Sequence, residues 1–294
     1  MRTPYLSPSS LACWDKDREE FYIRYLAESR PPRMPQTQAM AVGSAFDAFV
    51  KGWICEFLGG ENKWEMIFES SVEPQNRDIA IVDGRIVFDA YRELGLLADL
   101  VIMLDMSFTE PRVEMILRES VSGEIGGVPI LGKPDLMLSV ETSDGVIPVV
   151  LDWKVNGFYS SASPKRGYYC MRPSGSMHKD CVPMLVNGIF INVAEGFETI
   201  DSSWADQLAT YLWLDGEVVG TRALCVVHQI VRGKDSRFRA CDFRGQVGLA
   251  WQKGLLERYV KCWKDVLEWR DSRLEIVAKN FCDGGAFMEL TRHV

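Results

Sequence analysis

The apolar residues of the first hundred positions recur at the spacing of α-helices. Between positions 39 and 58 they form one broad apolar face, which predicts a helix, and a charged, aromatic-rich run predicts an earlier helix over 15–27. Ser7 followed by Pro8 is typical of a helix start, because serine caps free N–H groups and proline suits the first helical position. With a further helix predicted over 86–104, we expect residues 1–110 to form a helical N-terminal part.

After position 110 the pattern changes to runs rich in β-branched residues. Three runs predict a β-meander, at 112–120, 123–140 and 146–155. The next segment, 156–196, is rich in Ser, Gly, Pro and basic residues, and a loop of this length inside a domain is typically functional. We expect 156–196 to be an inserted loop segment, with a short strand pair following its loop-rich part, at 188–193 and 196–200.

The last part of the chain, 197–294, predicts a helix, a strand and a helix. Asp201 is a candidate N-cap for a helix over 204–214, which a β-branched strand and a long amphipathic helix follow, over 218–231 and 245–273. No composition break forces a domain boundary. The order of elements predicts one α/β domain over 1–294, with helices flanking a central sheet and the meander at 111–155 as its centre.

Two carboxylates and a lysine meet within this meander. Asp152 and Lys154 are two apart on a predicted strand, so both side chains project from one face. If the preceding run forms a hairpin with this strand, a turn centred between residues 143 and 144 puts Asp135 opposite Asp152. A turn one residue later puts Asp135 opposite Lys154. Both registers place the three side chains on one face, and only a one-residue slip separates them.

These residue types are the parts needed to hold a divalent metal beside a water molecule and a phosphodiester. The alternative is that an Asp-x-Lys pattern marks the solvated edge of a strand, which is the commoner meaning of such a pattern alone. The preceding Pro134-Asp135, the compatible hairpin and the apolar run over 149–151 favour a site.

The net charge is −8, from 33 basic and 41 acidic residues, which opposes non-specific binding to DNA. It does not exclude a nuclease, because basic residues gather in two segments. The first holds Lys165, Arg166, Arg172 and Lys179, and the second holds Arg232, Lys234, Arg237, Arg239 and Arg244. Each segment predicts either a DNA-binding groove or a solvated loop.

The eight cysteines are never closer than eleven residues, so the sequence has no C-x-x-C motif and we expect neither a local zinc site nor an iron–sulfur cluster. No apolar stretch has the length of a membrane span, and the first residues lack the apolar core of a signal peptide. We therefore expect a cytoplasmic protein without a membrane partner.

Three motifs together resemble those of the PD-(D/E)XK nucleases. They are Pro134-Asp135, Asp152-Trp153-Lys154 and Gln207-x-x-x-Tyr211, and the last is a signature of the branch that holds the RecB nuclease domain, λ exonuclease and the RecE exonuclease. Residues 6–26 are similar to the first helix of these nucleases. Gly43-x-x-x-Asp47 resembles their G-x-x-x-H motif, with Asp47 in place of the metal-binding histidine. The resemblance covers roughly residues 5–215.

The resemblance implies a restriction-endonuclease-like core with a mixed sheet and a metal-dependent nuclease. Asp135, Asp152, the main-chain carbonyl of Trp153 and Asp47 would bind one or two Mg²⁺ or Mn²⁺ ions, which carboxylates suit as hard ligands. Lys154 would orient or help deprotonate the attacking water. Gln207 and Tyr211, on one face of a helix, would reach DNA or brace the site.

The function expected from this resemblance is DNA exonuclease activity, of the phage or recombination type, on linear duplex or single-stranded DNA. The segment 160–180 is expected to form a flap over the strand, with its basic residues on phosphates. A single-strand-annealing or recombination protein would be the partner, and the host cytoplasm the location of a phage-encoded enzyme. The alternatives are a structure-specific endonuclease of the same fold, an inactive nucleic-acid-binding protein and a phage structural protein.

Overall fold

The computed structural model describes most of the chain. The described residues are 5–27, 32, 34–113, 121–142, 145–157, 183–186, 189–194, 196–217, 219–220, 222–232, 236 and 238–282. Their contacts divide the chain into two compact units. Unit 1 takes in 1–33, 122–132 and 253–294, and unit 2 takes in 34–121 and 133–252. The single domain with four consecutive parts that the sequence suggested remains a prediction.

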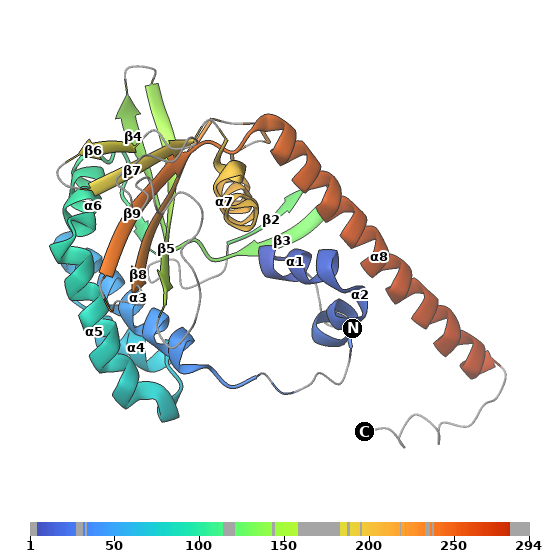
Figure 1. The fold of residues 1–294 in the computed structure, drawn as a ribbon. Coiled ribbons are helices and arrows are strands. Elements are labelled where there is room, and N and C mark those ends of the chain that lie inside the picture. Colours follow the sequence, from blue (N-terminus) through green and yellow to red (C-terminus); the bar gives the residue numbers. More distant parts are fainter. Residues whose placement is uncertain are drawn as a thin grey trace. The chain divides into compact units, whose positions relative to one another are not determined.

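Unit 2 is built on a seven-stranded mixed sheet (Figure 1). The strand order is β1 (Arg112–Val113), β4 (Leu136–Thr142), β5 (Gly145–Asn156), β8 (Leu224–Arg232), β9 (Phe238–Gly245), β7 (Ile189–Ala194) and β6 (Pro183–Val186). Neighbouring strands are antiparallel except for β5 with β8 and β7 with β9, which are parallel. The long connection between β5 and β8 contains a helix, as a parallel pair requires.

Helices cover both faces of this sheet (Figure 1). One face packs against helices that precede it in the chain, α3 (Gln38–Phe57), α5 (Arg77–Glu93) and α6 (Leu96–Asp105), and their apolar side chains form one core with β4, β5 and β8. The helix α4 (Trp64–Ser71) packs on α3. The other face carries α7 (Ser202–Leu214). The predicted α/β fold, a central mixed sheet flanked by helices, is confirmed.

Capping residues set the start of the two helices that matter for the site. Thr37 accepts a hydrogen bond from Met40 N–H at the start of α3, and Asp201 accepts from Ser203 and Trp204 N–H at the start of α7. Both helices were predicted within two residues of these bounds. Their buried faces then fix which residues point towards the sheet.

The β4–β5 hairpin has the register that places Asp135 opposite Asp152. Leu136 pairs with Leu151 and Thr142 pairs with Gly145, so the structure selects the first of the two registers that the sequence allowed. The strand predicted over 123–140 is broken, however. Its first part pairs within unit 1 as β2 (Val121–Ile125) and β3 (Val128–Gly132), and β4 begins only after Pro134, which has no N–H to donate.

Three other predicted elements differ from the structure. The helix over 86–104 is divided into α5 and α6 by Gly95, whose φ of 90° is the left-handed conformation that favours glycine. A helix was predicted over 245–273. Residue 245 is instead the last residue of β9, and the helix, α8 (Leu249–Cys282), begins four residues later. Of the strand pair predicted after the insertion, the second member is a 3₁₀ turn, Phe197–Thr199.

Unit 1 contains the N-terminal helices α1 (Pro8–Lys16) and α2 (Arg18–Phe21), the π-helical turn Tyr22–Leu26, the β2–β3 pair and the part of α8 from Lys253. Ser7 caps α1 and Pro8 stands at its first position, as predicted. Leu6 hydrogen-bonds to the main chain of β3 on both sides, through Pro129 O and Leu131 N. The single helix predicted over 15–27 is thus shorter pieces of helix.

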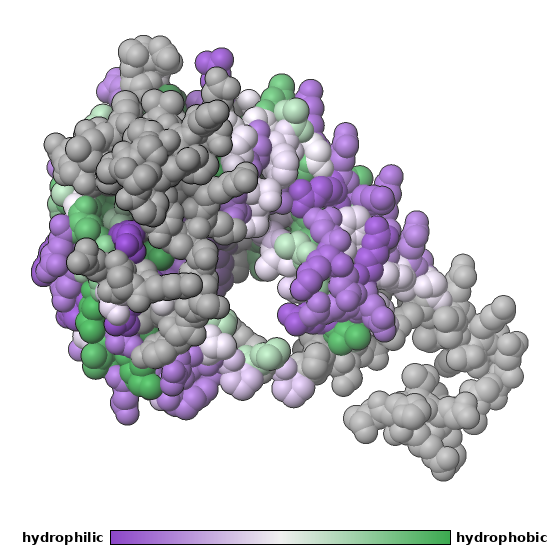
Figure 2. Space-filling view, in the orientation of Figure 1, coloured by the Kyte–Doolittle hydropathy of each residue, from purple (hydrophilic) through white to green (hydrophobic). Residues whose placement is uncertain are grey.

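The visible surface is mostly hydrophilic, with apolar side chains gathered over α5 and α6 (Figure 2). The exposed apolar residues of these helices include Ile79, Val82, Ile86 and Ile102. None of the helices among the described residues is long and apolar enough to cross a membrane.

Candidate active site

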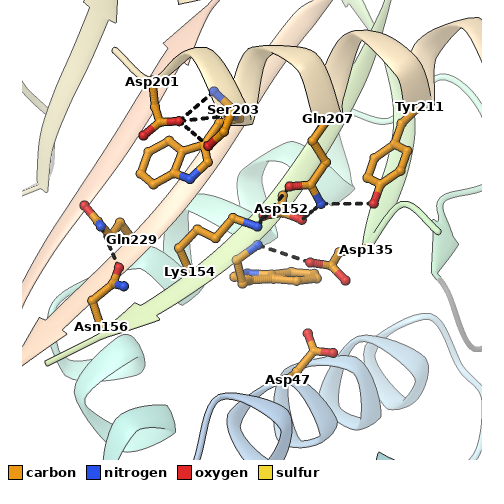
Figure 3. Close-up of polar contacts among 12 residues, drawn as sticks. Asp47, Asp135, Asp152, Lys154, Asn156, Asp201, Ser203, Gln207, Tyr211 and Gln229 are labelled. Carbon is orange, nitrogen blue, oxygen red and sulfur yellow. Dashed lines mark hydrogen bonds and ion pairs between the residues drawn. The ribbon is translucent and has the colours of Figure 1, made fainter. Parts of the chain in front are cut away.

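Three side chains that the sequence singled out converge at the β4–β5 hairpin (Figure 3). Asp152 and Lys154 project from one face of β5, where the Lys154 ammonium forms an ion pair with Asp152 Oδ2. Asp135 lies directly before β4, and the hairpin register, with Leu136 opposite Leu151, places it opposite Asp152. The period of two along a strand thus brings Asp135, Asp152 and Lys154 together.

The main chain of β5 holds the Asp135 carboxylate. Trp153 N–H donates to Asp135 Oδ2 at 3.3 Å. The indole of Trp153 lies on the opposite face of β5, where its Nε1–H donates to the hydroxyl of Tyr91 on α5 at 3.2 Å. The side chain of Trp153 therefore anchors β5 in the core, and its backbone N–H orients the Asp135 carboxylate.

Gln207 braces the site from α7 (Figure 3). Its side-chain Nε2 donates to Asp152 Oδ1 at 3.2 Å and to the Tyr211 hydroxyl at 3.0 Å, and its Oε1 accepts from Lys154 Nζ at 3.2 Å. One amide thus fixes a carboxylate and an ammonium group at once. Tyr211, one turn further along α7, is buried, and burial raises the pKa of its hydroxyl.

Helix α3 contributes an aspartate and a lysine from the other side of the hairpin. Lys51 Nζ lies 2.6 Å from Asp47 Oδ2 and 2.9 Å from Asp135 Oδ1, and the lysine side chain is only 1% exposed. Asp47, which was predicted as a metal ligand, therefore reaches the same group of charges as Asp135. Lys51 was not predicted. Its signal in the sequence is its position one helical turn after Asp47, on the same helix face.

Burial and the two lysines separate the titration of the paired carboxyl groups. Burial, with the neighbouring Asp135 carboxylate, raises the pKa of Asp152 to about 8. Burial opposes ionisation of Asp135 too, but the Lys51 ammonium and the Asp152 and Lys154 contacts hold its pKa below the ordinary value. Burial also disfavours the charged Lys154, yet the Asp152 carboxylate raises the pKa of Lys154. Near neutral pH, Asp135 is therefore the ionised member of the pair and Asp152 the protonated one.

A pocket of about 220 Å³ opens between α3 and the hairpin, beside Asp135. It is lined by Gly43, Ser44, Phe46, Asp47, Asp135, Trp153 and Val155. A Cβ added to Gly43 would meet no atom within 4 Å, so the glycine leaves open space rather than room for a neighbouring side chain. The glycine of the Gly43-x-x-x-Asp47 motif thus keeps the approach to Asp47 and Asp135 wide.

The polar face of β5 continues past Lys154. Asn156 follows two residues later and accepts a hydrogen bond through Oδ1 from Gln229 Nε2 on β8, at 2.7 Å. Sequence reasoning missed both residues, although the period of two from Asp152 through Lys154 indicates Asn156. They extend the polar surface of the site along the strand.

The predicted basic segments are only partly described. Lys165, Arg166, Arg172, Lys234 and Arg237, and the predicted flap over 160–180, lie outside the described residues. Arg232 is half-buried at the end of β8. The expectation that Arg244 lines a DNA groove is wrong, because its guanidinium binds the carboxylates of Asp99 and Asp242.

Asp99, Asp242 and Arg244 belong to a second group of buried polar and charged side chains. We call this group the Asp99 network, and its members are Tyr91, Asp99, His228, Asp242 and Arg244. Arg244 donates to both oxygens of Asp99 at 2.7 Å and to Asp242 Oδ2 at 2.6 Å. The His228 Nδ1 lies 2.8 Å from the Tyr91 hydroxyl, and its Nε2 lies 3.4 Å from Asp99 Oδ2.

The ligand atoms of Asp99, His228 and Asp242 lie within 4.8 Å of one another, which is close enough to hold a metal ion. Their carboxylates already bind the Arg244 guanidinium, however, so the chain itself supplies a cation to this network.

The pair of carboxyl groups at the hairpin has the better chemistry for a divalent ion. Asp135, Asp152 and Asp47 offer hard oxygen ligands from three separate segments, as Mg²⁺ and Mn²⁺ prefer. Burial and the ionised Asp135 raise the pKa of Asp152 to about 8, and a cation bound beside the pair would favour ionisation of both. The residues present therefore fit a divalent cation.

Comparisons with known proteins add little to this geometry. No protein-family model matches the chain, and no curated protein matches it. A crystal structure of a presumed exonuclease from Eubacterium rectale aligns over 91% of this chain and 82% of that chain, with 12% sequence identity and a TM-score of 0.41. This likeness is too slight to support an argument, so the function must be argued from the site itself.

Proposed function

We propose that this protein is a metal-dependent nuclease that hydrolyses phosphodiester bonds in DNA. The observation that carries the proposal is the pairing of Asp135 with Asp152 across the β4–β5 hairpin, with Lys154 on the same face and Gln207 bracing both Asp152 and Lys154. Two carboxyl groups that face each other repel one another when both are ionised, and a divalent cation bound between them would relieve that repulsion.

Asp135, Asp152 and Asp47, with the main-chain carbonyl of Trp153, would hold Mg²⁺ or Mn²⁺. When bound, such an ion neutralises charge on the phosphate and lowers the pKa of a water molecule. Asp135 is presented for this role by the Trp153 N–H, and Asp152 by the Gln207 amide. Neither carboxylate depends on a mobile contact for its orientation.

Lys154 acts as a hydrogen-bond donor and as a positive charge. Because the Asp152 carboxylate raises the pKa of Lys154, its amine carries a proton at neutral pH and cannot take one from water. Its ammonium, fixed between Asp152 and Gln207 Oε1, orients the attacking water and stabilises negative charge that develops on the phosphate. The base that accepts the water proton is then solvent or a substrate oxygen.

The choice of DNA as substrate and of exonuclease activity rests on the motif resemblance, whose Gln207 and Tyr211 lie together on α7 beside Asp152. In such an enzyme the basic residues at 165, 166, 172, 232, 234 and 237 would contact DNA phosphates. A single-strand-annealing or recombination protein that receives the processed strand would be the partner. Its place of action would be the cytoplasm, or the host cytoplasm for a phage-encoded enzyme.

The test is cleavage of end-labelled linear duplex and closed circular DNA by the wild-type protein and by Lys154→Ala. With Mg²⁺ or Mn²⁺, the wild-type protein is expected to degrade linear DNA and to spare circles, and Lys154→Ala should be slower by about 10²–10³-fold, as when one charge-stabilising donor is lost. Lys63→Ala, an exposed lysine outside the site, is the matched control. Nicking of circles would show an endonuclease, and no metal-dependent cleavage of any substrate would exclude a nuclease.

A further inference from the structure

Lys51 stands at a position that no motif of the sequence assigns. It is on α3, one turn after Asp47, and its side chain is 1% exposed although it carries an ionisable amine. Lysine is among the residues that are almost never fully buried unless paired. Lys51 forms ion pairs with Asp47 Oδ2 at 2.6 Å and with Asp135 Oδ1 at 2.9 Å. A buried ammonium is thus built into the acidic site.

Lys51 places its charge between two carboxylates that could otherwise receive a cation. Asp47 and Asp135 come from different elements, and an oxygen of each lies within 2.9 Å of the Lys51 Nζ. A second divalent cation held by Asp47 and Asp135 would lie close to this ammonium and would be repelled by it. The Lys51 ammonium and a second divalent cation would therefore compete for the same two carboxylates.

The charges of the site also favour one divalent cation over two. Among the described residues, and with both paired carboxyl groups ionised, Asp47, Asp135 and Asp152 contribute three negative charges to the site, and Lys51 and Lys154 contribute two positive ones. One divalent cation and one phosphodiester would balance the charges of these five residues. Two divalent cations would leave an excess of two positive charges in a largely buried site, which is costly.

We infer that Lys51 is a built-in replacement for the second metal ion, so that the site takes a single divalent cation, held by Asp135 and Asp152. Lys51 is then a positioning residue: it holds Asp47 and one oxygen of Asp135. This inference rests on the proposed metal site. It changes one part of that site: Asp47, proposed above as a metal ligand, binds the lysine instead, and the hairpin carboxylates Asp135 and Asp152 hold the metal.

The test is the number of Mn²⁺ ions bound by the full-length protein after removal of metals, measured by calorimetry and by the electron spin resonance of free Mn²⁺. The wild-type protein is expected to bind one ion. Lys51→Met, which keeps the length and packing of the side chain but removes its charge, should bind two. Lys51→Arg, which restores a cation, should bind one, and Lys51→Met combined with Asp47→Asn should return to one.

Two ions bound by the wild-type protein would overturn the inference whether or not any variant folds. One ion bound by a folded Lys51→Met, checked by circular dichroism and thermal unfolding, would overturn it too. The proposed function fails in a different way. In that case the wild-type protein and Lys51→Met bind no Mn²⁺ at micromolar to millimolar concentrations, or bind it and cleave no DNA.

Discussion

Two groups of buried charges are linked through β5, and their carboxylates are paired in different ways. In the first group Asp135 and Asp152 lie opposite each other at the β4–β5 hairpin, with single ammonium groups from Lys51 and Lys154 beside them. In the second group, the Asp99 network, the planar guanidinium of Arg244 donates to both oxygens of Asp99 and to Asp242. Trp153 links the groups, because its N–H binds Asp135 and its indole binds Tyr91.

The two groups differ in the cation that the protein supplies to them. An arginine fork matches carboxylates in fixed geometry, whereas a lysine is a point charge. In each group one carboxyl group has a lowered pKa: burial opposes ionisation of Asp99 and Asp135, but His228 and Arg244 outweigh it for Asp99, and Lys51 does so for Asp135. The other carboxyl group has a raised pKa because burial dominates, to about 8 for Asp152, and upward for Asp242 in spite of His228 and Arg244. We therefore expect the hairpin group, with its point charges, to accept a further cation, and the Asp99 network, with its arginine fork, to stabilise the fold.

Removing the arginine should have the largest effect on stability. Arg244→Met leaves Asp99 and Asp242 buried without their guanidinium, so we expect the free energy of unfolding to fall by about 3–5 kcal/mol. Chemical denaturation followed by circular dichroism measures it. Arg92→Met, which breaks an exposed ion pair with Asp89, is the control and should cost less than about 0.5 kcal/mol. Equal losses for the two variants would contradict a structural role of the Asp99 network.

The raised pKa of Asp152 predicts a dependence of stability on pH in the metal-free protein. A carboxyl group whose pKa is higher in the folded state stabilises the fold below its unfolded pKa, and this contribution is lost as the pH rises towards 8. Between pH 5 and pH 8 we expect the unfolding free energy of the wild-type protein to fall by about 1–3 kcal/mol relative to Asp152→Asn. Denaturation in EDTA at both pH values measures this difference. Parallel pH profiles would show that Asp152 ionises normally.

The hydrogen bonds of the Tyr91 hydroxyl, which link the two groups, should contribute less to the free energy of unfolding than Arg244 does. Tyr91→Phe removes the hydroxyl that binds Trp153 Nε1 and His228 Nδ1, and buried polar atoms without partners cost about 1–3 kcal/mol. We expect a loss of about 1–2 kcal/mol, measured by thermal and chemical unfolding, and a small decrease in cleavage rate through Trp153. Tyr5→Phe, at an exposed position, should change neither. If Tyr91→Phe has the same free energy of unfolding as the wild-type protein, the two groups are not coupled through Tyr91.

The sequence predicted the hairpin because its information is local. Alternation placed Asp152 and Lys154 on one face, and the turn signals limited the register to two choices, of which Leu136 opposite Leu151 is one. The capping of α7 by Asp201 and the start of α1 at Ser7 and Pro8 depend on neighbours within four residues. These parts of the fold follow from short-range physical chemistry.

The parts that the sequence did not predict depend on contacts far along the chain. Lys51 reaches Asp135 across 84 positions, and Arg244 reaches Asp99 across 145, so neither pairing has a local signal. β9 was missed because its alternation is interrupted by arginines that look solvated until their partners are known. The break at Pro134 was missed because both flanking runs are β-rich, yet they belong to different sheets.

The most direct test of the central claim compares one carboxylate from each group. It is the single-turnover rate of cleavage of linear DNA in Mn²⁺ by Asp152→Asn and by Asp242→Asn, each corrected for its folded fraction. We predict that Asp152→Asn loses at least about 10²-fold in rate without losing stability, and that Asp242→Asn loses stability but cleaves within about twofold of the wild-type rate. Full activity of Asp152→Asn, or equal loss of activity in a folded Asp242→Asn, would contradict the division into a functional and a structural group.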